Sequence, residues 1–197
     1  MILGTHNSAT GGKLLWWQKF FAWIINPTSK CQDRTIPEQL ADGVKVFNLQ
    51  VAKVAGKWRF THGLAIYKEN IFDILSLLKL GASVKEPIYF QLYNDKCFWS
   101  KRNLEEFKQL IEYIKTNYCT TYFIMQDTWF EGTDIHPYTN KCNLQMEEHY
   151  WSMGWAKHNA ESWIDKLPLP KRHAKKYNKK YKSNCKKEYL MLDFYEQ

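Results

Sequence analysis

Two histidines stand at the ends of short apolar runs, each beside a turn that contains glycine. His6 and Asn7 follow the run at residues 2–4, and His62 follows the run at residues 57–61. A histidine titrates near neutral pH and can therefore accept a proton in one step and donate one in the next. One histidine at a strand end is usually structural, whereas two flanked by amides favour an acid–base pair.

Other polar side chains accompany this pair. Asn48 and Gln50 lie two residues apart in the predicted strand at residues 44–51, and this spacing turns both side chains to one face. Asp193 lies near the end of the last apolar run, at residues 189–194. Taken alone, a carboxylate at a strand end is as readily structural as functional.

The elements that must position these residues alternate between strands and helices. Strands are predicted at residues 2–4, 44–51, 57–61, 88–93, 121–126 and 189–194, and helices at residues 13–25, 70–80 and 103–117. This alternation predicts a mostly parallel sheet. Residues 127–170 are rich in Trp and turn formers, with one further helix expected around residues 147–163. So few strands suffice only for a short or incomplete barrel.

Five sequence blocks resemble the catalytic domain of the phosphatidylinositol-specific phospholipases C. They read, in order, ILGTHNSAT, QLADGVKVFNLQV, WRFTHGL, EPIYFQLYND and YLMLDFYE. The spacing of the first three blocks agrees with the bacterial members, and residues 127–170 match by order and length only. The resemblance implies a single domain over residues 1–197, of the α/β class, folded as a distorted, incompletely closed TIM-like (β/α) barrel.

The resemblance also implies roles. His6 would be the general base for the inositol 2-hydroxyl, which attacks the neighbouring phosphorus and expels diacylglycerol. His62 would be the general acid for the leaving oxygen, and Asp193 would orient His6 and fix its tautomer. The expected reaction is phospholipase C-type cleavage of an inositol phospholipid, or of another phosphodiester with a neighbouring hydroxyl, to a cyclic product.

Four positions depart from that family. Asn7 is an aspartate in the bacterial members, and acids that bind calcium in other members are replaced by Asn48, Gln50 and Tyr93. These neutral side chains would form only a weak Ca²⁺ site, and we expect neither a cofactor nor a bound metal.

Gln50 also replaces a bacterial arginine that stabilises the phosphate charge, and Tyr93 replaces an assisting lysine. Loss of such a donor costs about 3 kcal/mol. Lys53, Arg59, Lys96 or the basic run described below are candidate substitutes. The alternative function is a lipid- or phosphate-binding module that has lost turnover.

An aromatic segment directly after the His6 turn predicts contact with a membrane. Trp16, Trp17 and Phe20 belong to a run of apolar residues that nearly surrounds the predicted helix at residues 13–25. Aromatic amphipathic helices lie in the plane of a lipid interface. The alternative is a helix buried against the barrel, apolar on many sides for that reason.

Composition and charge restrict the other functions. The 197 residues are 45% hydrophobic and 24% charged, and no apolar run approaches the about 20 residues of a membrane span. Without a visible signal peptide, we expect a cytoplasmic or peripheral membrane protein. The five cysteines (Cys31, Cys97, Cys119, Cys142 and Cys185) are odd in number and without C-x-x-C spacing, which favours a reducing compartment.

One segment makes the chain basic. Residues 171–187 hold nine Lys and Arg and no acid, whereas the rest of the chain has 19 basic and 20 acidic residues. Such a run is by default a solvated, flexible loop. Its functional alternatives are contact with an anionic membrane surface or with nucleic acid, and nothing else in the chain supports nucleic acid. The oligomeric state is left open.

Overall fold

The longest strand, β2 (Val46–Val54), organises the sheet. In the structure, a computed structural model that describes residues 1–95, 103–126, 146–150 and 152–197, β5 (Ile88–Asn94) runs parallel along one edge of β2. The opposite edge is shared by two strands. β1 (Ile2–Thr5) pairs in parallel with the beginning of β2, and β3 (Lys57–His62) pairs antiparallel with its end. These strands therefore approach each other end to end along a common neighbour.

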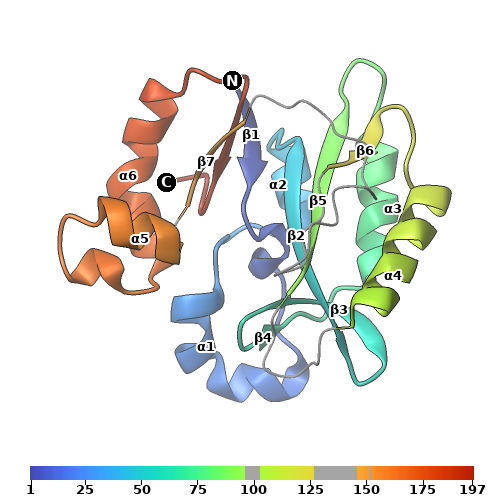
Figure 1. Ribbon diagram of the computed structural model, residues 1–197, viewed down its shortest axis with the longest axis horizontal. Coiled ribbons are helices and arrows are strands. Elements are labelled where there is room, and N and C mark those ends of the chain that lie inside the picture. Colours follow the sequence, from blue (N-terminus) through green and yellow to red (C-terminus); the bar gives the residue numbers. More distant parts are fainter. Residues whose placement is uncertain (96–102, 127–145, 151) are drawn as a thin grey trace.

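The remaining strands extend the sheet on both sides (Figure 1). β8 (Tyr189–Leu192) pairs in parallel with β1, and β7 (Met146–His149) pairs in parallel with β8. β6 (Phe123–Met125) pairs in parallel with β5, and the two-residue β4 (Ala65–Ile66) returns antiparallel on β3. Within the described ranges, no hydrogen-bonded ladder joins β6 to β7. The chain is thus a mixed α/β protein with an incompletely closed sheet, as predicted.

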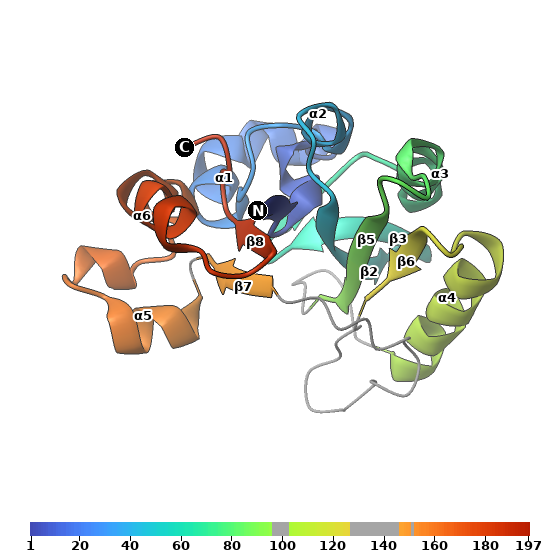
Figure 2. The same cartoon turned by 90° about the horizontal axis from the view of Figure 1, so that it is seen from above.

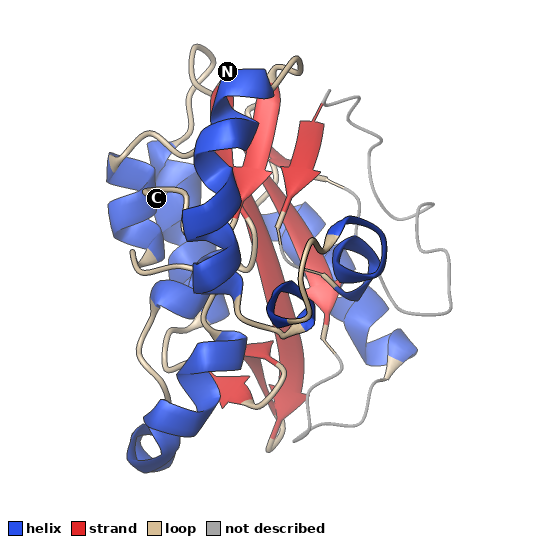
Figure 3. Cartoon of the chain, turned by 90° about the vertical axis from the view of Figure 1, so that its left-hand side faces the viewer, coloured by secondary structure: helices blue, strands red, loops and turns tan. Residues whose placement is uncertain are grey.

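Helices follow one another around the outside of the strands (Figure 2). The α-helices are α1 (Ala22–Ser29), α2 (Ile36–Ala41), α3 (Ile71–Gly81), α4 (Leu104–Asn117), α5 (Met153–Asn159) and α6 (Pro170–Asn184). Short 3₁₀ helices are η1 (Ser8–Gly11), η2 (Trp16–Phe21) and η4 (Ile164–Lys166). Figure 3, seen from the side of α5 and α6, shows these two helices in front of the strands.

Local sequence signals account for several helix starts. Thr35 and Glu38 form a reciprocal capping box at α2. At α4, the Asn103 side chain caps the helix by accepting a hydrogen bond from the Glu106 backbone N–H. One face of α4 is apolar and buried, and it consists of Phe107, Leu110, Ile111 and Ile114. Capping and periodicity therefore place these helices without help from distant residues.

The predicted helix at residues 13–25 is wrong in its boundaries. Leu14 forms an isolated antiparallel bridge with Tyr67, so the chain is extended there. The segment then forms the 3₁₀ helix η2, and α1 continues to Ser29 with Pro27 inside it. Pairing of Leu14 with the distant Tyr67 therefore keeps the start of this segment extended, although the local apolar pattern favours a helix there.

The helix expected around residues 147–163 is also corrected. Its first part is strand β7, which pairs along its whole length with β8, and among the described residues of that range only Met153–Asn159 is helical. A parallel partner from the end of the chain satisfies the backbone of this segment. No local pattern in the sequence encodes that partner.

The basic run at residues 171–187 is mainly the helix α6, and the expectation of a flexible loop is wrong. Its buried residues are His173, Ala174, Tyr177 and Asn178, a helical spacing that the abundance of lysine conceals. Asn178 Nδ2 donates hydrogen bonds to the carbonyls of Asp193 (2.8 Å) and Phe194 (3.0 Å). One face of α6 therefore holds the chain just after β8, where Asp193 lies.

Candidate active site

The edge of β2 shared by β1 and β3 brings the two histidines together. Thr5 pairs with Phe47, so His6 follows β1 at the level of Asn48. Phe60 pairs with Val51 in the antiparallel ladder, so His62, two residues on, reaches the level of Leu49. Both histidines lie at the ends of their strands, as predicted, but His62 approaches from the opposite direction because β3 is antiparallel to β2. Their ring centroids lie 6.4 Å apart with an angle of 82° between the planes.

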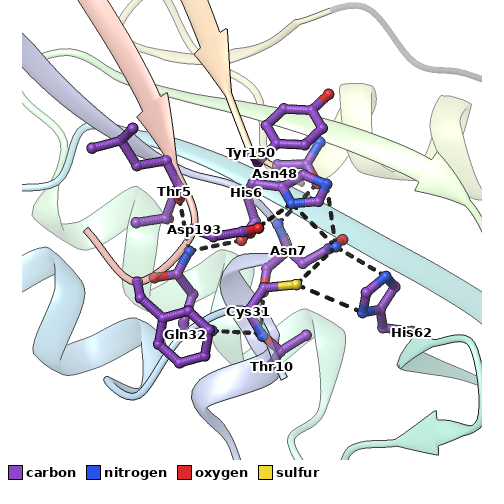
Figure 4. A network of polar contacts seen from close by, with 12 residues as sticks. Thr5, His6, Asn7, Thr10, Cys31, Gln32, Asn48, His62, Tyr150 and Asp193 are labelled. Atoms are coloured by element: carbon purple, nitrogen blue, oxygen red, sulfur yellow. Dashed lines mark hydrogen bonds and ion pairs between the residues drawn. The ribbon is translucent and has the colours of Figure 1, made fainter. Parts of the chain in front are cut away.

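His6 is oriented by a buried carboxylate (Figure 4). Its Nδ1–H donates to Asp193 Oδ1 at 2.8 Å, and Asp193 has no exposed surface. Gln32 Nε2 donates to the carbonyls of His6 (2.8 Å) and Leu192 (2.9 Å), and so ties the ends of β1 and β8 together. This arrangement leaves His6 Nε2 with a lone pair that can accept a proton.

His62 is held by the last residue of α1. Its Nδ1–H donates to the Ser29 carbonyl at 2.7 Å, so the second nitrogen, Nε2, faces the site. Burial lowers the pKa of His62, while the hydrogen bond to Ser29 and the negative charge of Asp95 oppose that shift. A lowered pKa makes the protonated form of this imidazole a better proton donor.

Asn7 lies between the two imidazoles. Its Nδ2 is 3.2 Å from His6 Nε2 and 3.2 Å from His62 Nε2, so one amide bridges the two nitrogens that face the site. The backbone of Asn7 is left-handed (φ 47°, ψ 51°), a conformation that Asn adopts more readily than most residues. Asn48 Oδ1 accepts from the Asn7 backbone N–H at 3.1 Å and supports this turn.

The three side chains that replace the calcium-binding acids of the family divide into two groups. Asn48 is buried, and its Nδ2 donates to Gln91 Oε1 at 3.0 Å. Gln50 and Tyr93 are half-buried and pair directly across β2 and β5. With Asn48 oxygen committed to the backbone and Asp193 committed to His6, these side chains do not fit a calcium cage rich in carboxylates.

The candidate cations are mostly engaged elsewhere. Lys53 forms an ion pair with Glu106 at 2.7 Å, and Arg59 donates to the Lys68 carbonyl. Lys171, from the basic run, pairs with Asp33. Lys96 lies outside the described residues. Lys53, Arg59 and Lys171 are therefore engaged with other groups and are not free to supply the charge of the bacterial arginine.

Two residues of the site were not predicted from the sequence. The ring of Tyr150 stacks on His6, with centroids 3.7 Å apart and an angle of 4° between the planes. Its hydroxyl donates to Glu148, and burial raises its pKa. Tyr150 follows β7, in the stretch interpreted as helix, so no local signal placed it here.

Cys31 is the second such residue. Its Sγ is 3.5 Å from Asn7 Nδ2 and 3.8 Å from His62 Nδ1, and only 1% of the residue is exposed. Burial and then the charge of Asp193 raise the pKa of the thiol, so the group is an uncharged thiol at neutral pH. In the sequence, Cys31 is a cysteine without C-x-x-C spacing, so no local pattern indicated that it belongs to the site.

The aromatic segment is strongly exposed. Trp16 (74%), Phe20 (75%) and Trp23 (77%) project from η2 and α1, and Phe21 and Ile24 are also exposed. Trp17 is half-buried and Gln18 is fully buried, so one face packs on the protein. Large apolar side chains gathered on one surface are typical of an interaction site. In the part of the chain that the structure describes, no helix is both long and apolar enough to cross a bilayer.

Comparison with known proteins finds relatives by structure. Phosphatidylinositol-specific phospholipase C from Listeria monocytogenes superposes with a TM-score of 0.61 and 12% identity, over 98% of this chain and 87% of that chain. The Staphylococcus aureus enzyme gives 0.63 and 14% over 98% and 85%, and a second structure of it gives 0.60 and 14% over 98% and 85%. No protein-family model and no curated protein matches the sequence. The chain therefore has the fold of the phosphatidylinositol-specific phospholipases C, as the sequence blocks predicted.

The electrostatics of His62 can be measured directly. Replacement Asp95→Asn removes a negative charge that raises the pKa of His62, so we expect that pKa to fall further below its ordinary value. Histidine ring resonances followed by NMR across a pH series give the shift. Asp73→Asn, on the exposed side of α3, is the control. An unchanged or raised His62 pKa in the Asp95 variant would contradict the assigned environment.

Proposed function

We propose that the chain is a phosphodiesterase of the phospholipase C type, which cleaves an inositol phospholipid by acid–base chemistry between His6 and His62. One observation carries the proposal. A histidine oriented by a buried carboxylate faces a second histidine across a single amide, inside the fold of the phosphatidylinositol-specific phospholipases C. In-line displacement at a phosphodiester requires one group that removes a proton and another that protonates the leaving oxygen.

In the proposed first step, His6 Nε2 removes the proton from the 2-hydroxyl of the inositol ring. The hydroxyl oxygen attacks the phosphorus, and the bond to the diacylglycerol oxygen breaks. Asp193, hydrogen-bonded to Nδ1, favours the imidazolium that forms and keeps Nε2 directed at the substrate. The product is a cyclic phosphodiester.

In the same step, protonated His62 delivers its Nε2 proton to the departing diacylglycerol oxygen. Its Nδ1–H stays bonded to the Ser29 carbonyl, so the ring keeps its orientation throughout. The Asn7 amide lies between the two reacting nitrogens and is well placed to donate to a phosphate oxygen.

The exposed aromatic segment would bring the site to the lipid. Trp23 of α1 and Lys171 of α6 line one groove, so a basic helix adjoins the aromatic surface. Apolar side chains can enter the lipid boundary while lysines attract anionic headgroups. The S. aureus structure with the highest similarity given above concerns membrane binding of that enzyme.

A binding module without turnover is the second candidate. It is favoured by Gln50, which stands where the bacterial family has arginine, and by the engagement of Lys53 and Arg59 with other groups. Such a protein would retain the lipid-facing surface and bind the inositol phosphate headgroup without cleaving it.

Replacing either histidine tests the proposal. His6→Ala and His62→Ala should each lower cyclic inositol phosphate formation by at least about a hundredfold, because each removes one proton transfer. Asp193→Asn should also lower the rate by about a hundredfold or more, with the fold retained, because His6 loses its orienting carboxylate. Phosphorus NMR on phosphatidylinositol vesicles, with calcium and with chelator, measures the product.

The control is His158→Ala, which changes an exposed histidine on α5. Turnover by the His6 variant at the wild-type rate would show that the base is another group. Vesicle binding without cleavage by the wild-type protein would favour the binding module.

Gln50→Arg tests the missing charge. The arginine would place a permanent positive charge near the phosphate oxygens as they gain negative charge, so kcat should rise by about tenfold or more. Combining it with Asn7→Asp should increase the rate further, since the bacterial family has both residues. Initial rates in chelator for wild type, both single variants and the double variant provide the measurement.

Gln50→Leu, of similar size and without a donor, is the matched control. A fast wild type that is slowed by Gln50→Arg would mean that the transition-state charge is stabilised by another group. Gln50 would then be an adaptation of this site.

The lipid-facing surface predicts a loss of vesicle binding. Trp16→Ala and Phe20→Ala should each weaken partitioning onto phosphatidylinositol-containing vesicles by about tenfold, since each removes apolar area from the lipid boundary. Sedimentation with the vesicles measures this partitioning. Trp163→Ala is the control, because Trp163 is 72% exposed but lies outside the aromatic segment. An equal loss in the control would show that this segment is not the membrane contact.

A further inference from the structure

Three potential metal ligands from distant parts of the chain converge beside the acid–base pair. One ligand atom each from His6, Cys31 and Asp193 lies within 4.8 Å of the other two. They follow β1, α1 and β8, respectively, and all three residues are buried, with exposed fractions of 9%, 1% and 0%. Figure 4 shows the sulfur and the carboxylate on the side of His6 away from Tyr150.

The chemistry of this set selects one class of ion. Thiolate, imidazole and carboxylate are the ligands of Zn²⁺, whereas Ca²⁺ and Mg²⁺ are held by oxygen atoms. Ligand atoms around a tetrahedral zinc ion lie about 3.3–3.8 Å apart, given bonds of about 2.0–2.3 Å. His6 Nδ1 and Asp193 Oδ1 lie 2.8 Å apart, and all three ligand atoms lie within 4.8 Å of one another, which is close to that spacing.

Charge balance also favours a divalent ion. Asp193 is buried, and coordination of Cys31 would add a thiolate, so the pocket would hold two negative charges. A divalent cation neutralises both, and it favours the thiolate that burial and Asp193 otherwise oppose. Binding would release the thiol proton to solvent and would shift the single ring proton of neutral His6 from Nδ1 to Nε2, so affinity should increase with pH.

The Asn7 side chain borders this set. Its Nδ2 contacts Cys31, His6 and His62, and its Oδ1 is buried without a hydrogen-bond partner among the described residues. An unpaired buried amide oxygen carries a free-energy cost, which a polar ligand bound beside Asn7 would reduce.

We propose that His6, Cys31 and Asp193 form a binding site for Zn²⁺ or a similar thiophilic divalent cation, and that the bound ion inhibits the acid–base pair. Coordination through Nδ1 moves the single ring proton of neutral His6 from Nδ1 to Nε2. The atom that would accept the substrate proton is then already protonated. Metal binding is independent of the proposed phosphodiesterase function, whereas the inhibition depends on it.

The first experiment measures coordination by absorbance. Co²⁺ is titrated into reduced, metal-stripped protein, and the thiolate-to-cobalt charge-transfer band is followed. Two matched variants separate the thiols, since Cys31→Ser retains the other four cysteines. The second variant carries Cys97→Ser, Cys119→Ser, Cys142→Ser and Cys185→Ser and retains Cys31 alone.

The variant that retains only Cys31 should show the band, and the Cys31→Ser variant should not. Zn²⁺ should abolish the band by competition, whereas Ca²⁺ should leave it unchanged. Adding His6→Gln or Asp193→Asn to the variant with Cys31 alone should weaken Co²⁺ binding by at least about tenfold, because even outer-shell partners are worth that much. These additions also keep the test valid if Cys31→Ser fails to fold.

A band that survives Cys31→Ser, or one unaffected by both His6→Gln and Asp193→Asn, would overturn the site.

The second experiment compares Zn²⁺ inhibition of phosphatidylinositol cleavage, each protein relative to its own metal-free rate. Inhibition should be reversed by chelator and weakened by at least about tenfold in Cys31→Ser. Equal inhibition of that variant would overturn the inhibitory role. A Cys31-dependent band in a protein without cleavage activity would support the metal site and count against the proposed function alone.

Discussion

Hydrogen bonding along one edge of β2 is the constraint on which the candidate site depends. β1 and β3 share this edge, from opposite directions, and neither can extend further without displacing the other. Both strands must therefore turn away from β2 near Asn48, and the residues at these two positions are His6 and His62. The 6.4 Å separation of their rings is thus a result of strand register.

The orientation of His6 depends on elements that follow it by most of the chain length. β8 pairs with β1, which places Asp193 beside His6, and Asn178 of α6 binds the carbonyls of residues 193 and 194. Gln32 joins the same two strand ends from the other side. A buried carboxylate is stable only when it is well hydrogen-bonded. The contacts that allow Asp193 to be buried are therefore also the ones that orient His6.

The candidate site combines two histidines placed as the proposed proton transfer requires with neutral side chains where the bacterial enzymes have charged ones. Asn7, Asn48 and Gln50 can donate hydrogen bonds, but they supply no positive charge to a dianionic transition state. The same neutrality leaves Asp193 and the Cys31 thiol as the acidic groups close to His6, which favours a thiophilic cation over a hard one. The neutral side chains at these positions therefore support both the binding-module alternative and the zinc proposal.

Elements whose signals are local could be predicted from the amino-acid sequence. Apolar runs placed the strands that carry His6 and His62, capping placed α4, and the spaced motifs identified the fold and Asp193. Tertiary structure alone decided that residues 146–149 pair as β7, that the basic run packs as α6, and that Tyr150 and Cys31 reach the site. The reason is physical: capping and periodicity act over a few residues, whereas β7 and Cys31 are placed by partners far away in the chain. The lysine-rich composition of α6 likewise conceals its buried face, which can be recognised only when the part of the protein that it covers is known.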